Sequence, residues 1–124
     1  MKDHTTLNAW KIAREVAIES ATICRRHWHP AYSAKFSQLT RAALSVRLNI
    51  AEGYAFMNTP TFRRHLDIAY GSAVETGEAI EHAIATEMLP PSEGAKLLEK
   101  SKVSQRLTYG LLLYVKRQQQ PKKD

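Results

Sequence analysis

The stretch from Gln38 to Tyr54 carries apolar side chains at alternating steps of three and four residues. With one residue just before the stretch, this apolar seam consists of Phe36, Leu39, Ala43, Val46 and Ile50. An α-helix turns once in ~3.6 residues, so these side chains share one face, as in a helix that packs in a bundle. A second, mostly polar stripe runs beside the seam at the same spacing, at Gln38, Ala42, Ser45, Asn49 and Glu52. The stretch therefore predicts a helix with one face in a core and another that meets solvent or a polar partner.

Three further segments carry the same spacing, and breaks that contain proline separate all four segments. The breaks fall at His29-Pro30, Thr59-Pro60 and Leu89-Pro90-Pro91, where proline and the residue before it resist helical continuation. The predicted helices span residues 7–28, 34–56, 60–87 and 92–117, and residues 118–124 form a basic tail that we expect to be disordered. Because short connections favour antiparallel neighbours, residues 1–117 are predicted to form one all-α domain, an antiparallel up-down-up-down four-helix bundle.

The predicted third helix is rich in small residues. After Leu66 its apolar seam is mostly Ala, Gly and Thr, although glycine inside a helix costs ~1 kcal/mol relative to alanine. We therefore expect Gly71 and Gly77 to lie where another helix comes close. On this interpretation, Gly71→Leu disrupts the bundle or its assembly by overpacking.

The charge of the chain is unevenly distributed. The net charge is +6, yet residues 65–99 hold one basic and seven acidic side chains, whereas residues 1–64 hold ten and four, and residues 100–124 hold seven and one. One interpretation is attraction between helices of a bundle or between neighbouring subunits. The other is that two basic surfaces are left for a polyanion.

Polar residues of the second and third helices are expected to meet across the bundle. The predicted network consists of Ser45, Asn49, Glu52, Gly71, Ser72 and Glu75. It would either fix the register of the two helices or form a catalytic or ligand pocket, and the structural interpretation is favoured. The sequence contains no Glu-x-x-His pair of a di-iron bundle, no nucleophile elbow and no phosphate loop, and Cys24 fits a core position. We therefore expect no catalytic residue, no metal and no cofactor.

Two segments of the chain resemble a known family. They are Arg41-Ala42-Ala43-Leu44-Ser45-Val46 followed by Asn49-Ile50-Ala51-Glu52-Gly53, and Ile68-Ala69-Tyr70-Gly71-Ser72-Ala73-Val74-Glu75. The family comprises small four-helix-bundle proteins encoded in intervening sequences of bacterial large-subunit ribosomal RNA genes, and the resemblance covers nearly the whole chain. The accessory proteins of diversity-generating retroelements are more distantly similar, and they bind nucleic acid and a reverse transcriptase. The resemblance implies a four-helix bundle assembled as a homopentamer.

Basic side chains are the best candidates for a binding surface. The candidates are Lys11, Arg14, Arg25, Arg41, Arg47, Arg63, Arg64, Lys116 and Arg117. With no apolar run of ~20 residues and no apolar N-terminal signal, we expect a cytoplasmic protein without a membrane partner. The sequence thus predicts a non-enzymatic, homo-oligomeric accessory protein that binds RNA or an RNA–DNA hybrid, mainly through phosphate contacts. The alternative is a protein-interaction scaffold whose basic face docks an acidic partner protein such as a reverse transcriptase.

Overall fold

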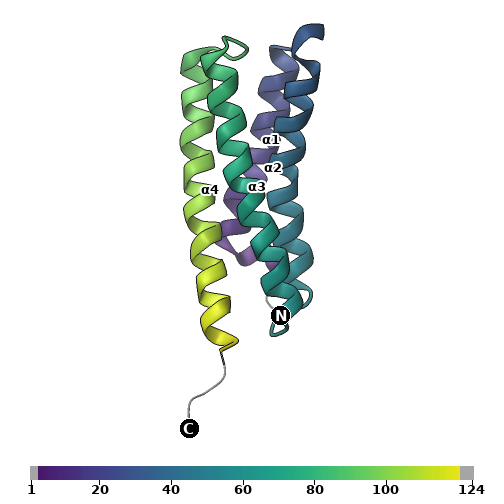
Figure 1. Cartoon of the computed structure of the whole chain (residues 1–124), viewed down its shortest axis with the longest axis vertical. Helices are drawn as coiled ribbons and strands as arrows, with labels where there is room; N and C mark the ends of the chain where they lie inside the picture. The colour runs from purple at the N-terminus through teal and green to yellow at the C-terminus, as the bar shows by residue number, and fades with distance from the viewer. Residues whose placement is uncertain (1–2, 121–124) are drawn as a thin grey trace.

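Four long α-helices dominate the computed structural model, which describes residues 3–120. They are α1 (Asn8–Arg26), α2 (Ser33–Tyr54), α3 (Pro60–Ala85) and α4 (Pro91–Gln118). Two short 3-10 helices, η1 (His4–Thr6) and η2 (Pro30–Tyr32), precede α1 and α2, and no strand occurs within the described residues. Figure 1 shows the four α-helices side by side along the long axis of the molecule. The prediction of an all-α protein with four helices is confirmed.

The predicted helix boundaries differ from the observed ones by no more than two residues at any end. The first helix was predicted to reach residue 28 but ends at Arg26, because His27 has left the helical region with φ −108° and ψ 21°. The third was predicted to reach residue 87 but ends at Ala85, because Glu87 adopts a left-handed conformation with φ 62°. Of the predicted disordered tail, Gln118 belongs to α4, and residues 121–124 lie outside the described residues.

The core consists of two apolar clusters, one toward each end of the bundle. One cluster includes Ile23, Leu39 and Ile80, and the other includes Ile50 and Leu66. Every residue of the predicted α2 seam is buried. In α3 and α4, the chain between the two clusters carries buried hydroxyl side chains rather than large apolar ones, namely Thr76, Ser101, Ser104 and Thr108.

Within one chain, Gly77 is confirmed to lie where another helix comes close and Gly71 does not, while a contact of Gly71 in an assembly stays a prediction. Gly71 lies exposed on α3, and a Cβ atom added there would have no neighbouring atom within 4 Å. Gly77 is buried against α4, where an added Cβ would lie 2.5 Å from Nε2 of Gln105. The spacing of small residues places both glycines on one helix, but only the position of the neighbouring helix decides which of them is covered.

Candidate nucleic-acid interface

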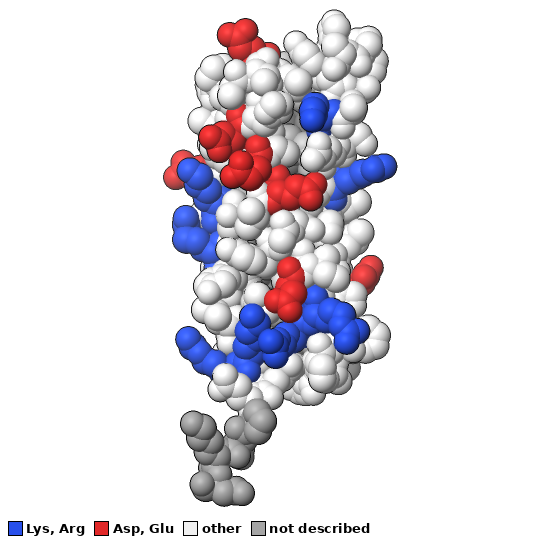
Figure 2. Space-filling model, in the orientation of Figure 1, with Lys and Arg blue, Asp and Glu red and all other residues white. Residues whose placement is uncertain are grey.

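Four of the predicted basic residues lie together at one end of the molecule. Two belong to the first turns of α3 and two to the last turn of α4. The side-chain amide of Gln119 donates a 2.7 Å hydrogen bond to the carbonyl of Thr59, which holds the end of α4 beside the start of α3. Figure 2 shows a band of Lys and Arg side chains across this end of the visible face. We call these four residues the basic end: Arg63, Arg64, Lys116 and Arg117.

The cations of the basic end are only weakly neutralised by the rest of the described chain. Both arginines of α3 and Arg117 are exposed. Nζ of Lys116 lies 3.9 Å from Oδ1 of Asp67, and the two side chains are 37% and 52% exposed. An ion pair at this distance and exposure contributes little to stability, so it leaves most of the positive potential available to a ligand.

The start of α3 adds positive potential of its own. Thr59 precedes the helix, but its hydroxyl donates to the carbonyl of Phe56 and does not cap a helix amide. The first amides of α3 therefore lack a side-chain cap, and the helix dipole leaves a partial positive charge there. This charge lies beside Arg63 and Arg64.

Apart from Asp67, the acidic side chains of α3 lie away from the basic end. Glu75, Glu78 and Glu81 are exposed further along the helix. In Figure 2 most acidic side chains of the visible face lie above the basic band, and one lies directly against its upper edge. An anionic ligand is therefore attracted toward one end of the molecule rather than to the whole face.

The other predicted basic residues lie on α1 and α2. Lys11, Arg14 and Arg25 are exposed on α1, which contacts α2 and α4 but not α3. Arg41 is exposed on α2. The guanidinium of Arg47 lies 5.4 Å from the centre of the indole ring of Trp10, a cation–π contact that ties α2 to α1. A role of these five residues in binding remains a prediction.

The predicted polar network between α2 and α3 forms only in part. The Ser45 and Ser72 hydroxyls are 2.8 Å apart, and the amide of Asn49 donates to the carbonyl and hydroxyl of Ser45. The ring of His65, which the sequence analysis missed, lies 3.0 Å from Oδ1 of Asn49. These contacts link α2 to α3 and so fix their register.

Three members of the predicted network lie outside it. Glu52, Gly71 and Glu75 are exposed, and none of them takes part in the hydrogen bonds among Ser45, Asn49, His65 and Ser72. They share a helix face with the network residues but lie farther from the contact between α2 and α3. His65 lies 16 residues after Asn49, on the other side of the connection between α2 and α3. The shortness of this connection is the signal that could have found it.

A second set of polar groups was not predicted at all. Ser20, Ser101 and Thr108 are 0%, 1% and 0% exposed, and their hydroxyls have no hydrogen-bond partner within the described residues. In contrast, the buried hydroxyl of Thr76 donates to the carbonyl of Ser72. Small hydroxyl side chains substitute for alanine in a helix seam, so the sequence pattern alone treats them as apolar positions.

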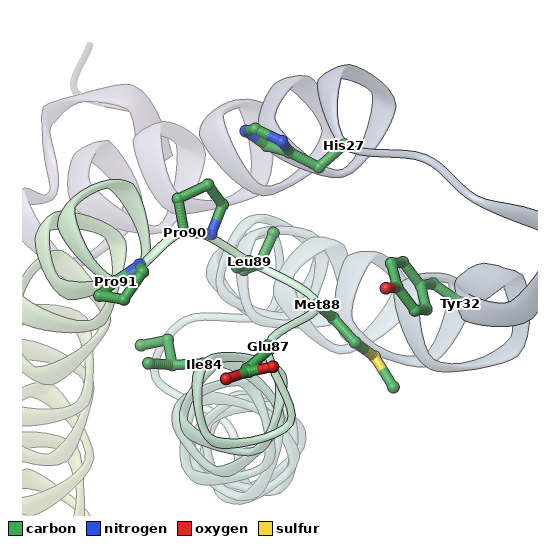
Figure 3. A pocket seen from close by; sticks show the side chains of 8 residues that line it. All are labelled: His27, Tyr32, Ile84, Glu87, Met88, Leu89, Pro90 and Pro91. Atoms are coloured by element: carbon green, nitrogen blue, oxygen red, sulfur yellow. The ribbon is translucent and has the colours of Figure 1, made fainter.

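A pocket of about 460 Å³ lies at the end opposite the basic end. Figure 3 shows its lining, which comes from His27 after α1, Tyr32 of η2 and the connection between α3 and α4. The ring of His27 bonds to the carboxylate of Glu93, and the guanidinium of Arg26 lies 2.8 Å from the same carboxylate. These bonds, that of His27 foremost, hold the pKa of Glu93 below its ordinary value of 4.5. The contacts fasten the start of α4 to the end of α1.

Three other features bear on possible chemistry, namely the single cysteine, the metal-ligating side chains and the apolar character of the helices. Cys24 is 5% exposed, and burial raises the pKa of its thiol to about 11, so the reactive thiolate is scarce at neutral pH. Within residues 3–120, no three His, Cys, Asp or Glu side chains lie close enough together to hold a metal ion. No helix in the same range combines the length and apolar character needed to cross a membrane.

The fold and the basic end together define a small all-α protein with four helices and one strongly positive end. The chain belongs to the 23S rRNA-intervening sequence protein family, whose family model matches residues 5–110. This confirms the family inferred from the sequence. The matched range contains Arg63 and Arg64 but ends before Lys116 and Arg117. A comparison with curated proteins found no match.

Proposed function

We propose that this protein is a non-enzymatic, cytoplasmic accessory factor that binds RNA through its basic end. The observation that carries the proposal is the placement of Arg63 and Arg64 at the uncapped start of α3 and of Lys116 and Arg117 at the adjoining end of α4. Residues that far apart in sequence form one surface only in the folded chain. The family's name refers to ribosomal RNA, which favours RNA as the polyanion.

The proposal takes the helices in up-down-up-down order and the protein as a homopentamer. Consecutive helices are joined by short connections at alternate ends, which supports the order. The exposed cations of α1 and the exposed carboxylates of α3 carry opposite charge on helices that do not contact each other within one chain, which supports attraction between subunits. In a ring, each basic end is repeated around the axis, so contacts to one RNA molecule reinforce each other.

The proposal is tested by fluorescence anisotropy of a labelled RNA stem-loop with a single-stranded tail, measured at several salt concentrations. We expect the logarithm of the affinity to fall linearly with the logarithm of salt concentration, by ~0.7–0.9 per phosphate neutralised. The double variant Arg63→Glu with Arg64→Glu should bind at least about 10-fold more weakly and show a shallower slope.

A charge-matched control separates the basic end from net charge. Lys102→Glu with Arg106→Glu makes the same change in charge at exposed positions of α4, ~15 Å or more along the helix from Lys116. We expect this control to lose much less affinity. Equal losses in the two double variants would contradict a localised site.

The acidic-partner alternative is an outcome of the same experiment. If the wild-type protein binds neither the stem-loop nor an RNA–DNA hybrid at low salt, the RNA proposal fails. A pull-down that survives nuclease treatment and is lost in the Arg63 and Arg64 double variant would then assign the basic end to an acidic protein, such as a reverse transcriptase.

A further inference from the structure

A pocket of about 700 Å³ opens at the basic end of the molecule. Its walls come from segments far apart in sequence and include Leu7 before α1, Tyr54 in α2, Phe62 in α3 and Tyr114 in α4. Arg63 belongs both to this lining and to the basic end. The pocket and the band of cations are therefore neighbouring parts of one surface.

Three aromatic residues contribute to the pocket wall. Tyr54 and Phe62 meet edge to face, with ring centres 6.0 Å apart and ring planes at 88°. Tyr114 is 59% exposed, so its ring is largely accessible. Phe62 is buried, so Tyr114 offers the accessible ring. An accessible aromatic ring beside cations is an arrangement by which proteins bind unpaired bases, since the ring stacks on the base and the cations meet the phosphates.

Two side-chain amides lie on the same wall. Asn58, in the turn between α2 and α3, and Gln118, near the end of α4, both line the pocket. Each amide offers donors and an acceptor, the groups that match the hydrogen-bonding edge of a base. The amide of Gln119 is in contrast occupied by the carbonyl of Thr59.

We propose that this pocket receives an unpaired base of single-stranded RNA, while Arg63 and the other cations of the basic end hold the adjoining phosphates. The inference rests on the proposed function and adds a preference to it. A base inside a duplex is stacked and paired and cannot enter the pocket, so the protein prefers RNA with an unpaired segment. The pocket is thus the part of the surface that distinguishes single-stranded from double-stranded RNA.

The test compares Tyr114→Ala with Tyr114→Phe, using the stem-loop with a single-stranded tail and a blunt duplex of the same stem. The ring of Tyr114 is largely exposed, so its removal leaves the core intact. We expect Tyr114→Ala to bind the tailed RNA about 5- to 150-fold more weakly, the usual effect of losing one stacked base. We expect Tyr114→Phe to retain the affinity, and neither variant to change binding of the duplex.

Two readouts distinguish stacking from charge. The salt slope of Tyr114→Ala should equal that of the wild type, because no cation is removed, whereas Arg63→Glu with Arg64→Glu reduces it. A 2-aminopurine base placed in the single-stranded tail should change in fluorescence on binding to wild-type protein and to Tyr114→Phe, but not on binding to Tyr114→Ala.

Each outcome supports or overturns the inference. If Tyr114→Ala binds the tailed RNA as tightly as the wild type, or weakens tailed and duplex RNA equally, the pocket does not bind a base. If that happens while the Arg63 and Arg64 double variant still weakens binding, the proposed function stands and only the pocket inference falls. If the wild type binds no RNA at low salt, both are overturned.

Discussion

Gly53→Ala should destabilise the protein at a close contact between α2 and α3. A Cβ atom added at Gly53 would lie 2.7 Å from Cβ of His65 and 3.0 Å from Cδ1 of Phe62, whereas carbon atoms pack favourably at ~3.5–4.0 Å. Cβ of His65 is bonded directly to the backbone of α3, so a change of rotamer cannot move it away. Relief requires the two helices to separate, which strains the 3.0 Å contact between His65 and Asn49.

Gly71→Ala is the matched control. Gly71 lies in a helix, as Gly53 does, but an added Cβ there meets nothing within 4 Å. Both variants gain the helix preference of alanine, up to ~1 kcal/mol, and only Gly53→Ala incurs the overpacking cost of about 1–3 kcal/mol. The free energy of unfolding of Gly53→Ala should therefore be about 1–3 kcal/mol below that of Gly71→Ala, with the wild type between them or close to Gly53→Ala.

Urea unfolding followed by far-UV circular dichroism measures this difference. All variants must be compared at one protein concentration, because assembly shifts apparent stability by mass action. With a urea dependence of ~1–3 kcal/mol per M, the two unfolding midpoints should differ by roughly 0.5–2 M. Coincident midpoints would refute the reasoning, since they would show that α2 and α3 accommodate a methyl group at Gly53 without cost.

Three further substitutions test individual features of the fold. Thr108→Val removes a buried hydroxyl without a partner in the described residues and should raise the free energy of unfolding, measured by urea unfolding, by about 1 kcal/mol. The control Thr76→Val removes a bonded hydroxyl and should not raise it. Glu87 adopts a left-handed conformation at the end of α3, where its amide bonds to the carbonyl of Ile84. Because glycine adopts this conformation without strain, Glu87→Gly should raise the melting temperature by an amount equivalent to about 1 kcal/mol, whereas Glu87→Ala should not. Glu93→Gln tests pH dependence: because the pKa of Glu93 is lowered in the folded protein, its contribution is present above the unfolded pKa and lost as pH falls through the folded pKa. The difference in melting temperature between wild type and Glu93→Gln should thus shrink as the pH falls through the folded pKa of Glu93 and vanish in acid.

The sequence predicts the helices well because their causes are local. The seam from Phe36 to Ile50 follows from helical periodicity, and the breaks at Pro30, Pro60 and Pro90 follow from proline sterics, so neither needs knowledge of a neighbour. The errors at helix ends are also local in origin, since a left-handed Glu87 is rarely expected where glycine or asparagine is preferred.

Contacts between helices are less predictable, because helix spacing gives only the angle of a side chain around its own axis. Gly71 and Gly77 both fit a small-residue pattern, yet only Gly77 faces α4. The α2 stripe correctly contained Ser45 and Asn49, but their partner His65 depends on how the turn before α3 positions that helix. The pocket at the basic end is still harder to infer, since it requires side chains from the beginning, middle and end of the chain to meet.

The four residues of the basic end differ in how strongly they indicate function. Lys116 and Arg117 lie at the end of α4, where cations interact favourably with the helix dipole, so folding alone explains them. Arg63 and Arg64 are the fourth and fifth residues of α3, where a cation still opposes the dipole, but by less than the ~0.3–1 kcal/mol typical of the first turn at low salt. Residues that oppose a local preference point to function.

This difference predicts opposite changes in stability and binding. Arg63→Glu with Arg64→Glu places two anions near the positive start of α3, so it should raise the melting temperature at low salt while it weakens RNA binding. Lys116→Glu with Arg117→Glu makes the same change in charge at the negative end of α4 and should lower both. Thermal unfolding at low and high salt, measured beside anisotropy, gives both readouts for each variant. If the Arg63 and Arg64 double variant loses stability and binding together, its binding defect reflects damage to the fold. The two arginines at the helix start would then not be binding residues that lower stability.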